Sequence, residues 1–155
     1  MRLKFPCFLQ KLDYDCGPTV LKMVLASFGI RANLKDLMRQ ARTTKRDGTT
    51  RRGLARVARS YGLSASAHCG ATFSEMDRLL RRGAMIVVEY ILPIFEGGHY
   101  AVVSGLDRGA VYLHDPSEGR YFRLPRREFA RRWYGRHNKT NTRWVMVVEG
   151  PRRTR

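Results

Sequence analysis

The stretch QKLDYDCGPTVLKMVLASFG, residues 10–29, joins a cysteine to the start of an apolar repeat. From Cys16 onward, apolar side chains recur every three or four positions, which predicts an amphipathic helix that Gly29 ends. Asp15 has a good helix-capping side chain, and Pro18 is typical of a first helical turn. We therefore expect Asp15 to cap this helix and Cys16 to lie at its N-terminal end.

A cysteine in that position has two interpretations. Backbone N–H groups and the helix dipole favour a thiolate there, and a thiolate is what a cysteine nucleophile needs. Cysteine is also among the residues most often buried for structural reasons, and position alone leaves that alternative open. Cys7, Cys16 and Cys69 are too few, and odd in number, for a disulfide framework. This cysteine usage fits a reducing compartment, so we expect a cytoplasmic location.

Length and composition favour one globular domain. The chain has 155 residues, 43% of them hydrophobic, which supports a real core and excludes a disordered chain. We expect one domain over residues 1–150 and a basic tail over residues 151–155. No apolar run reaches transmembrane length, and the charged N-terminus lacks a long apolar segment, so we expect no signal peptide. No C-x-x-C pair or Cys/His cluster is present, so we expect no metal site and no cofactor.

The charge is strongly positive. Thirty lysines and arginines against thirteen acidic residues give a net charge of +17. Residues 120–155 hold twelve basic and two acidic residues, a net +10. Such a section favours an acidic partner or a polyanion. A solvated arginine-rich surface is the alternative, because no motif of a known nucleic-acid reader is present.

Helices are expected in the first half of the chain and strands in the second. Asn33, either Thr49 or Thr50, and Ser74 are expected to cap the second, third and fourth helices. This order predicts an α+β protein with helices packed on a mostly antiparallel sheet. The strands are expected at residues 63–67, 84–92, 99–106, 110–115, 120–124 and 143–149, with a short helix at 125–135.

Two polar residues lie at the ends of neighbouring predicted strands. His99 starts strand 99–106, at an expected exposed strand end, and Asp115 ends strand 110–115. A turn near Asp107–Gly109 joins these strands into a hairpin, which brings both residues to its open end. Asp115 could then accept a hydrogen bond from one imidazole nitrogen and leave the other facing a thiol. The alternatives are a turn-forming Asp-Pro pair and a histidine with no catalytic role.

The other three histidines are weaker candidates. His114 should point to the sheet face opposite Asp115, because side chains alternate along a strand. His68 lies in a loop with no acid near it in sequence, and His137 lies in a basic polar segment that is expected to be solvated.

Gln10 precedes Cys16 by six residues. A side-chain amide there, together with the Cys16 backbone N–H, could stabilise an oxyanion during acyl transfer. Most glutamines are surface residues, so Gln10 alone carries little weight.

Together these features resemble a known family, the bacteriocin-processing cysteine peptidases. These are double-glycine leader peptidase domains at the front of peptide-exporting ABC transporters, with stand-alone relatives. Gln10, the DCG at residues 15–17 and the following apolar helix resemble the first motif of that family. HYAVVSGL…VYLHDP, with His99 and Asp115 sixteen residues apart, resembles the second, and LPRREFARRW with a final strand matches the expected ending.

The resemblance implies a papain-like α+β fold and cleavage of a peptide bond. It implies Cys16 as nucleophile, His99 as base, Asp115 as the residue that orients His99, and Gln10 as oxyanion donor. The implied substrate is a peptide or protein with a small-residue cleavage site, such as a leader peptide. A non-catalytic peptide-binding module of the same fold and a basic nucleic-acid-associated protein remain the alternatives.

Overall fold

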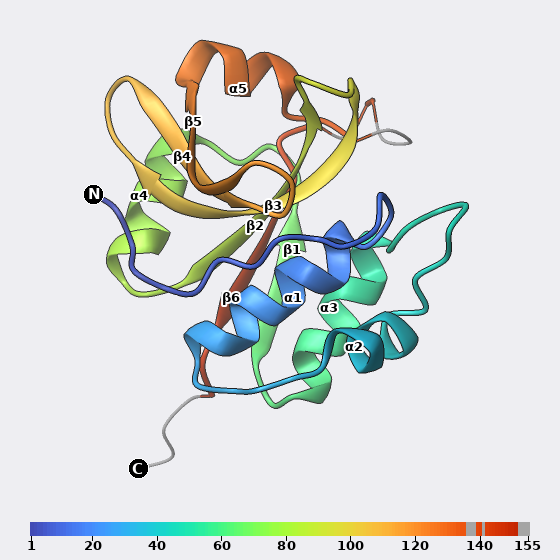
Figure 1. Cartoon of the computed structure of the whole chain (residues 1–155). Helices are drawn as coiled ribbons and strands as arrows, with labels where there is room; N and C mark the ends of the chain where they lie inside the picture. The colour runs from blue at the N-terminus through green and yellow to red at the C-terminus, as the bar shows by residue number, and fades with distance from the viewer. Residues whose placement is uncertain (136–138, 141, 152–155) are drawn as a thin grey trace.

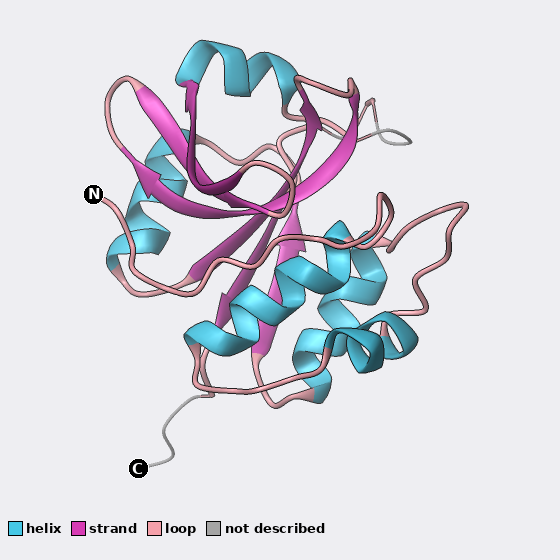
Figure 2. Cartoon of the chain, viewed as in Figure 1, coloured by secondary structure: helices cyan, strands magenta, loops and turns pink. Residues whose placement is uncertain are grey.

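The computed structural model describes residues 1–135, 139–140 and 142–151, which form five helices and one six-stranded sheet (Figures 1 and 2). The helices are α1 (Cys16–Ser27), α2 (Leu34–Gln40), α3 (Arg51–Ser60), α4 (Phe73–Arg81) and α5 (Arg126–Arg132). The strands are β1 (Ser64–His68), β2 (Met85–Leu92), β3 (Gly97–Leu106), β4 (Ala110–Asp115), β5 (Gly119–Pro125) and β6 (Val145–Glu149).

The sheet is antiparallel throughout, with strand order β1-β6-β2-β3-β4-β5. It curves strongly, so β4 and β5 turn away from the plane of β1 and β6 (Figure 2). β3 and β4 pair as the predicted hairpin, with Val102 opposite His114 and Leu106 opposite Val111. The expected α+β architecture with helices on an antiparallel sheet is confirmed.

Each face of the sheet carries its own core. Helices α1, α2 and α3 pack on one face, and α4 and α5 lie on the other (Figure 1). Strand side chains alternate between these cores: on β2, Val87 faces the first while Val88 and Tyr90 face the second. The same alternation places Ala101 and Val103 of β3 in the second core.

Of the four expected helix caps, Asn33 and Thr50 are confirmed, whereas Ser74 and Asp15 are wrong. Asn33 accepts a hydrogen bond from Lys35 N, and Thr50 accepts one from Gly53 N. The fourth helix begins two residues earlier than expected, because Thr72, not Ser74, caps it by accepting from Glu75 N.

The N-terminal segment runs between α1 and the curved part of the sheet before it enters α1 (Figure 1). Leu3 N donates to Ser104 O of β3, and Gln10 N donates to Pro116 O just after β4. The close approach requires glycine at position 105, because a Cβ there would lie 2.7 Å from Met1 O. This segment thereby fixes Gln10 beside the end of β4.

Among the described helices, none combines the length and the apolar character that crossing a lipid bilayer requires.

Candidate active site

Cys16 is the first residue of α1 and is half-buried. The following residue, Gly17, is buried against Thr49, which lies just before α3. A Cβ on Gly17 would lie 2.5 Å from Thr49 Oγ1 and 2.6 Å from Thr49 Cβ, so only glycine fits. The close contact between these two segments holds the start of α1, and with it Cys16, in place.

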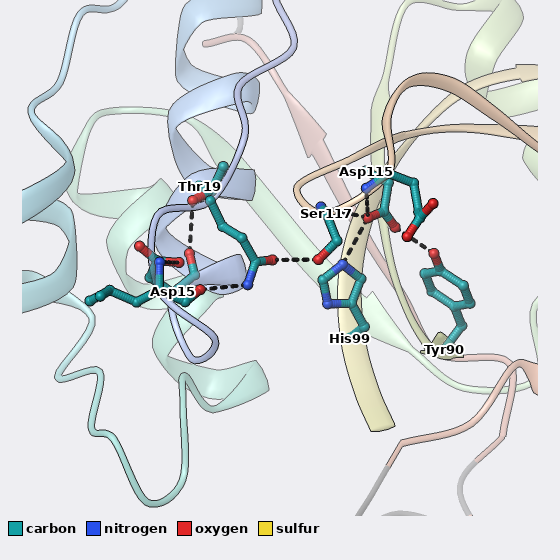
Figure 3. Close-up of polar contacts among 9 residues, drawn as sticks. Asp15, Thr19, Tyr90, His99, Asp115 and Ser117 are labelled. Carbon is teal, nitrogen blue, oxygen red and sulfur yellow. Dashed lines mark hydrogen bonds and ion pairs between the residues drawn. The ribbon is translucent and has the colours of Figure 1, made fainter. Parts of the chain in front are cut away.

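Asp15 occupies the N-cap position of α1, but its side chain does not cap the helix, which corrects the expectation. The carboxylate is completely buried and accepts hydrogen bonds from Lys11 N at 3.3 Å and Leu12 N at 3.1 Å. Thr19 bonds instead to the Asp15 backbone carbonyl, through both its N–H and its hydroxyl (Figure 3). Asp15 therefore orders the turn that follows Gln10.

His99 and Asp115 meet at the open end of the β3–β4 hairpin (Figure 3). His99 Nε2 donates to Asp115 Oδ1 over 2.9 Å. His99 is 6% exposed and Asp115 is fully buried, so the expectation of an exposed strand end for His99 is wrong. The loop that precedes β3 and the turn that follows β4 cover this end of the hairpin, and both line the same cavity as His99.

The His99 imidazole is hydrogen-bonded to the Asp115 carboxylate and lies beside the Cys16 side chain, which acts on its pKa. Burial lowers the pKa of His99, but the hydrogen bond to Asp115, the adjacent Cys16 side chain and the negative charge of Asp115 outweigh it and raise the pKa to about 10. The pKa of Asp115 is lowered: burial would raise it, but the bond and charge of His99 and the Tyr90 hydroxyl prevail. Close to neutral pH this arrangement favours an imidazolium beside an ionised carboxylate.

Gln10 lies on the same cavity as His99, with both ends of its amide engaged. Its Oε1 accepts from Ser117 Oγ at 3.0 Å, and its Nε2 donates to Leu12 O at 2.6 Å. An amide nitrogen carries two hydrogens, so one remains after the bond to Leu12. These contacts fix the plane of the amide at the edge of the cavity.

Two cavities flank the Cys16–His99 pair. The larger cavity, of about 1100 Å³, is lined by Gln10 and His99. The smaller cavity, of about 220 Å³, is lined by Cys16 and Tyr100. Gly98, immediately before His99, lines both, so the pair lies where the two cavities adjoin.

Four of the five large apolar side chains that are exposed among the described residues surround the larger cavity. We call this group the apolar rim; it consists of Leu9, Leu12, Ile94 and Phe95. Leu9 and Leu12 come from the segment before α1, and Ile94 and Phe95 come from the loop between β2 and β3. Exposed apolar side chains gathered around a cavity are typical of a surface that binds another molecule.

The structure separates two of the remaining histidines, His114 and His68, from the site. His114 faces the opposite side of β4 from Asp115, as expected, and contacts Phe5 and Tyr121. His68 is ion-paired with Glu75, which sequence proximity did not predict. His137 lies outside the described residues. Within the described part of the chain, no group of three or more His, Cys, Asp or Glu side chains could hold a metal ion.

Sequence reasoning missed three residues that support the site: Tyr90, Ser117 and Thr49. The Tyr90 hydroxyl donates to Asp115 Oδ2 (Figure 3), Ser117 connects Asp115 to Gln10, and Thr49 packs on Gly17. Tyr90 lies in an apolar strand run, and only the β2–β3 register, which sets it opposite His99, distinguishes it from a core residue. Nothing in the local sequence of Thr49 indicates its contact with α1.

The comparisons with known proteins agree with this geometry. The chain matches the peptidase C39 family over residues 4–137. It is 32% identical over 125 residues to the transport/processing ATP-binding protein ComA of Streptococcus pneumoniae, covering 78% of this chain but 16% of the relative's length. It is 33% identical over 143 residues to an uncharacterized protein of Methanothermobacter thermautotrophicus, covering 92% of this chain and 87% of the relative.

Solved structures of similar fold are also peptidases or peptidase domains. The double glycine motif protease of an AMS/PCAT transporter, determined in complex with the leader peptide, superposes with a TM-score of 0.74 at 25% identity, covering 96% of this chain and 94% of that one. The peptidase domain of Streptococcus ComA superposes with a TM-score of 0.76 at 22% identity, covering 96% and 100% of the two chains, which supports the fold. The chain therefore belongs to the peptidase C39 family and has the papain-like fold of its peptidase domains.

Proposed function

We propose that this protein cleaves peptide bonds through a catalytic triad of Cys16, His99 and Asp115, with Gln10 as an oxyanion donor. The observation that carries the proposal is the His99 imidazole, which bonds to the buried Asp115 carboxylate and lies beside Cys16 at the start of α1. A histidine held between an acid and a nucleophile is the arrangement that activates cysteine for acyl transfer.

The reaction begins from an ion pair of the Cys16 thiolate and the His99 imidazolium. Because Nε2 is occupied by Asp115, the other ring nitrogen, Nδ1, holds the proton that came from Cys16. The thiolate attacks the carbonyl carbon of the scissile bond, and the imidazolium returns the proton to the departing amine. A thioester on Cys16 remains. Water, deprotonated by His99, then attacks the thioester and releases the carboxylate product and the thiol.

The oxyanion that forms during each attack needs hydrogen-bond donors close to Cys16. The Cys16 N–H at the start of α1 is one such donor, and the free amide hydrogen of Gln10 is the other. The bonds of Gln10 to Ser117 and Leu12 hold its amide in one orientation before substrate arrives. Preorganised donors of this kind stabilise the transition state without reorganisation.

The two cavities support an extended peptide substrate that crosses the Cys16–His99 pair. The smaller cavity, of about 220 Å³, suits small side chains beside the scissile bond. The larger cavity, with its apolar rim, suits a segment with apolar side chains. The similar protease of known structure is a double glycine motif protease solved with its leader peptide. We therefore infer that this chain processes leader peptides at a double-glycine or similarly small site.

We further propose that an acidic partner or polyanion is attracted to the Arg-rich section from residue 120 onward. Part of that charge is neutralised internally, because Glu128 pairs with Arg131 and Arg132 of α5. A nucleophilic thiol requires reducing conditions, which supports the proposed cytoplasmic location. The chain spans only 16% of the length of the similar transport/processing protein ComA. The proposal for this chain therefore concerns peptide cleavage and does not extend to peptide export.

The test uses synthetic peptides with a Gly-Gly site and apolar residues preceding it, with cleavage followed by mass spectrometry. The wild-type protein is expected to cleave after the second glycine, and Cys16→Ala is expected to be inactive. Cys69→Ala is the matched control, because Cys69 is exposed and outside both cavities. A peptide aldehyde should form an adduct on Cys16 alone. Binding without cleavage or adduct would show a peptide-binding module, and full activity in Cys16→Ala would refute the mechanism.

A further inference from the structure

The Asp115 carboxylate receives hydrogen bonds from four donors. Oδ1 accepts three, from His99 Nε2 at 2.9 Å, Ser117 N at 2.8 Å and Glu118 N at 3.0 Å. Oδ2 accepts one, from the hydroxyl of Tyr90 (Figure 3). The carboxylate is fully buried, so no solvent competes for these positions.

The unequal distribution of donors makes Tyr90 distinctive. Three bonds converge on Oδ1 and constrain its position, but they do not by themselves fix rotation of the carboxylate about its Cβ–Cγ bond. The Tyr90 hydroxyl holds Oδ2 and thereby sets that rotation. It also sets the direction in which the Oδ1 lone pair meets His99.

Tyr90 is itself held firmly. It is completely buried on β2, directly opposite His99 in the β2–β3 register. Its ring meets the His99 imidazole edge to face, with centroids 6.0 Å apart, and packs against Phe129 of α5, also at 6.0 Å. A buried side chain packed between two other rings can position a partner accurately, which is what an active-site support requires.

We propose that Tyr90 is a positioning residue for the peptidase reaction: its hydroxyl fixes the orientation of the Asp115 carboxylate and keeps it ionised, and through Asp115 it fixes the imidazole of His99. This inference rests on the proposed function of the triad and adds a fourth residue that touches neither substrate nor Cys16. It assigns a catalytic consequence to a tyrosine that sequence patterning places in the core.

The hydroxyl also affects how the site titrates. His99 and Tyr90 are the titratable groups in direct contact with Asp115; Cys16 and Glu118 act on Tyr90, and the charge of Asp115 also reaches Cys7. The bond from Tyr90 lowers the pKa of Asp115, so its removal should raise that pKa. Asp115 would then become protonated at a higher pH, and activity would be lost earlier on acidification.

The test is Tyr90→Phe, which removes one oxygen and keeps the packed ring. Tyr112→Phe is the matched control, because the Tyr112 hydroxyl also donates to an aspartate, Asp107, at 2.9 Å, near the turn at the far end of the same hairpin. Tyr90→Phe should lower kcat about tenfold and leave KM within about twofold. The acid limb of its kcat/KM profile should move to higher pH, whereas Tyr112→Phe should match the wild type in both measurements.

A double-mutant cycle isolates the energetic coupling between Tyr90 and Asp115. In an Asp115→Ala background, which has no carboxylate to orient, Tyr90→Phe should have no further effect on kcat. An equal effect of Tyr90→Phe with and without Asp115 would overturn the proposal. So would a Tyr90→Phe enzyme whose kcat and acid limb equal those of Tyr112→Phe.

NMR of the unliganded protein tests the same contact without turnover. The wild type should show a downfield, slowly exchanging hydroxyl proton from Tyr90, and the His99 ring signals should shift in Tyr90→Phe but not in Tyr112→Phe. If the wild type cleaves no peptide, the proposed function fails, yet these signals still decide the positioning. Absence of the hydroxyl signal in the wild type would overturn the inference even if Tyr90→Phe did not fold.

Discussion

His114 should make the protein sensitive to acid, and His114→Phe should remove that sensitivity. The His114 side chain is fully buried on β4, between the rings of Phe5 and Tyr121. Neither ring nitrogen has a hydrogen-bonding partner of good geometry among the described residues. Burial, reinforced by the positive charge of Arg120, lowers its pKa from the ordinary 6.5 to about 4, against a small opposing effect of the Pro6 carbonyl.

The sign and size of the effect follow from this shift. Below its ordinary pKa the unfolded chain binds a proton at His114, but the folded protein does not bind it until the pH approaches 4. Acidification therefore favours the unfolded state across this interval. At about 1.4 kcal/mol per pKa unit, the full shift corresponds to a loss of about 3 kcal/mol in the free energy of unfolding. Phenylalanine has no titratable group, and its ring would pack with those of Phe5 and Tyr121.

Urea unfolding of the wild type and His114→Phe at a series of pH values measures the difference directly. The two proteins should have similar free energies of unfolding near neutral pH and should diverge as the pH falls towards 4. All other ionisable groups are shared, so they cancel in the difference between the two curves. His68→Phe provides a control for the loss of a histidine, because His68 is half exposed and paired with Glu75. A constant difference at every pH would refute the reasoning.

Two further predictions concern the site itself. Gly17→Ala should destabilise the protein by about 1–3 kcal/mol in urea unfolding, because the new Cβ overlaps Thr49; Thr49→Gly should restore part of the loss, and unchanged stability would contradict the contact. Asp115→Asn should move the alkaline limb of kcat/KM to lower pH. Asp115 helps to raise the pKa of His99 to about 10, and the protonated imidazole is lost as the pH rises through that value; an unmoved limb would argue against this role of Asp115.

Much of the fold was predictable because its elements have strong local periodicity. The helix expected at residues 16–28 is Cys16–Ser27, and the strand expected at 84–92 is Met85–Leu92. The cap expected at Ser74 was wrong because two hydroxyl residues, Thr72 and Ser74, precede the same apolar repeat. The apolar repeat does not show which of the two hydroxyls bonds to the helix, and in the structure Thr72 does so.

The site was partly predictable for the same reason. A hairpin fixes which residues share its open end, so the meeting of His99 and Asp115 could be inferred from turn position and strand length. The hydrogen bonds of the Asp15 side chain could not be inferred in this way. Helix-capping preference suggested a bond to α1, but the turn after Gln10 offers Lys11 N and Leu12 N to the same carboxylate. That competition depends on how the N-terminal segment docks on the sheet.

The helices, the strands and the hairpin that joins His99 to Asp115 could be predicted from local patterns, because those features depend on neighbouring residues and on repeats of fixed period. Only the folded chain brings Cys16 of α1 beside His99 of β3 and sets the Tyr90 hydroxyl of β2 on Oδ2 of Asp115 at the end of β4. The approach of these four elements is set by burial of two cores on opposite faces of one curved sheet. Contacts between residues so far apart in sequence leave no local pattern from which they could be predicted.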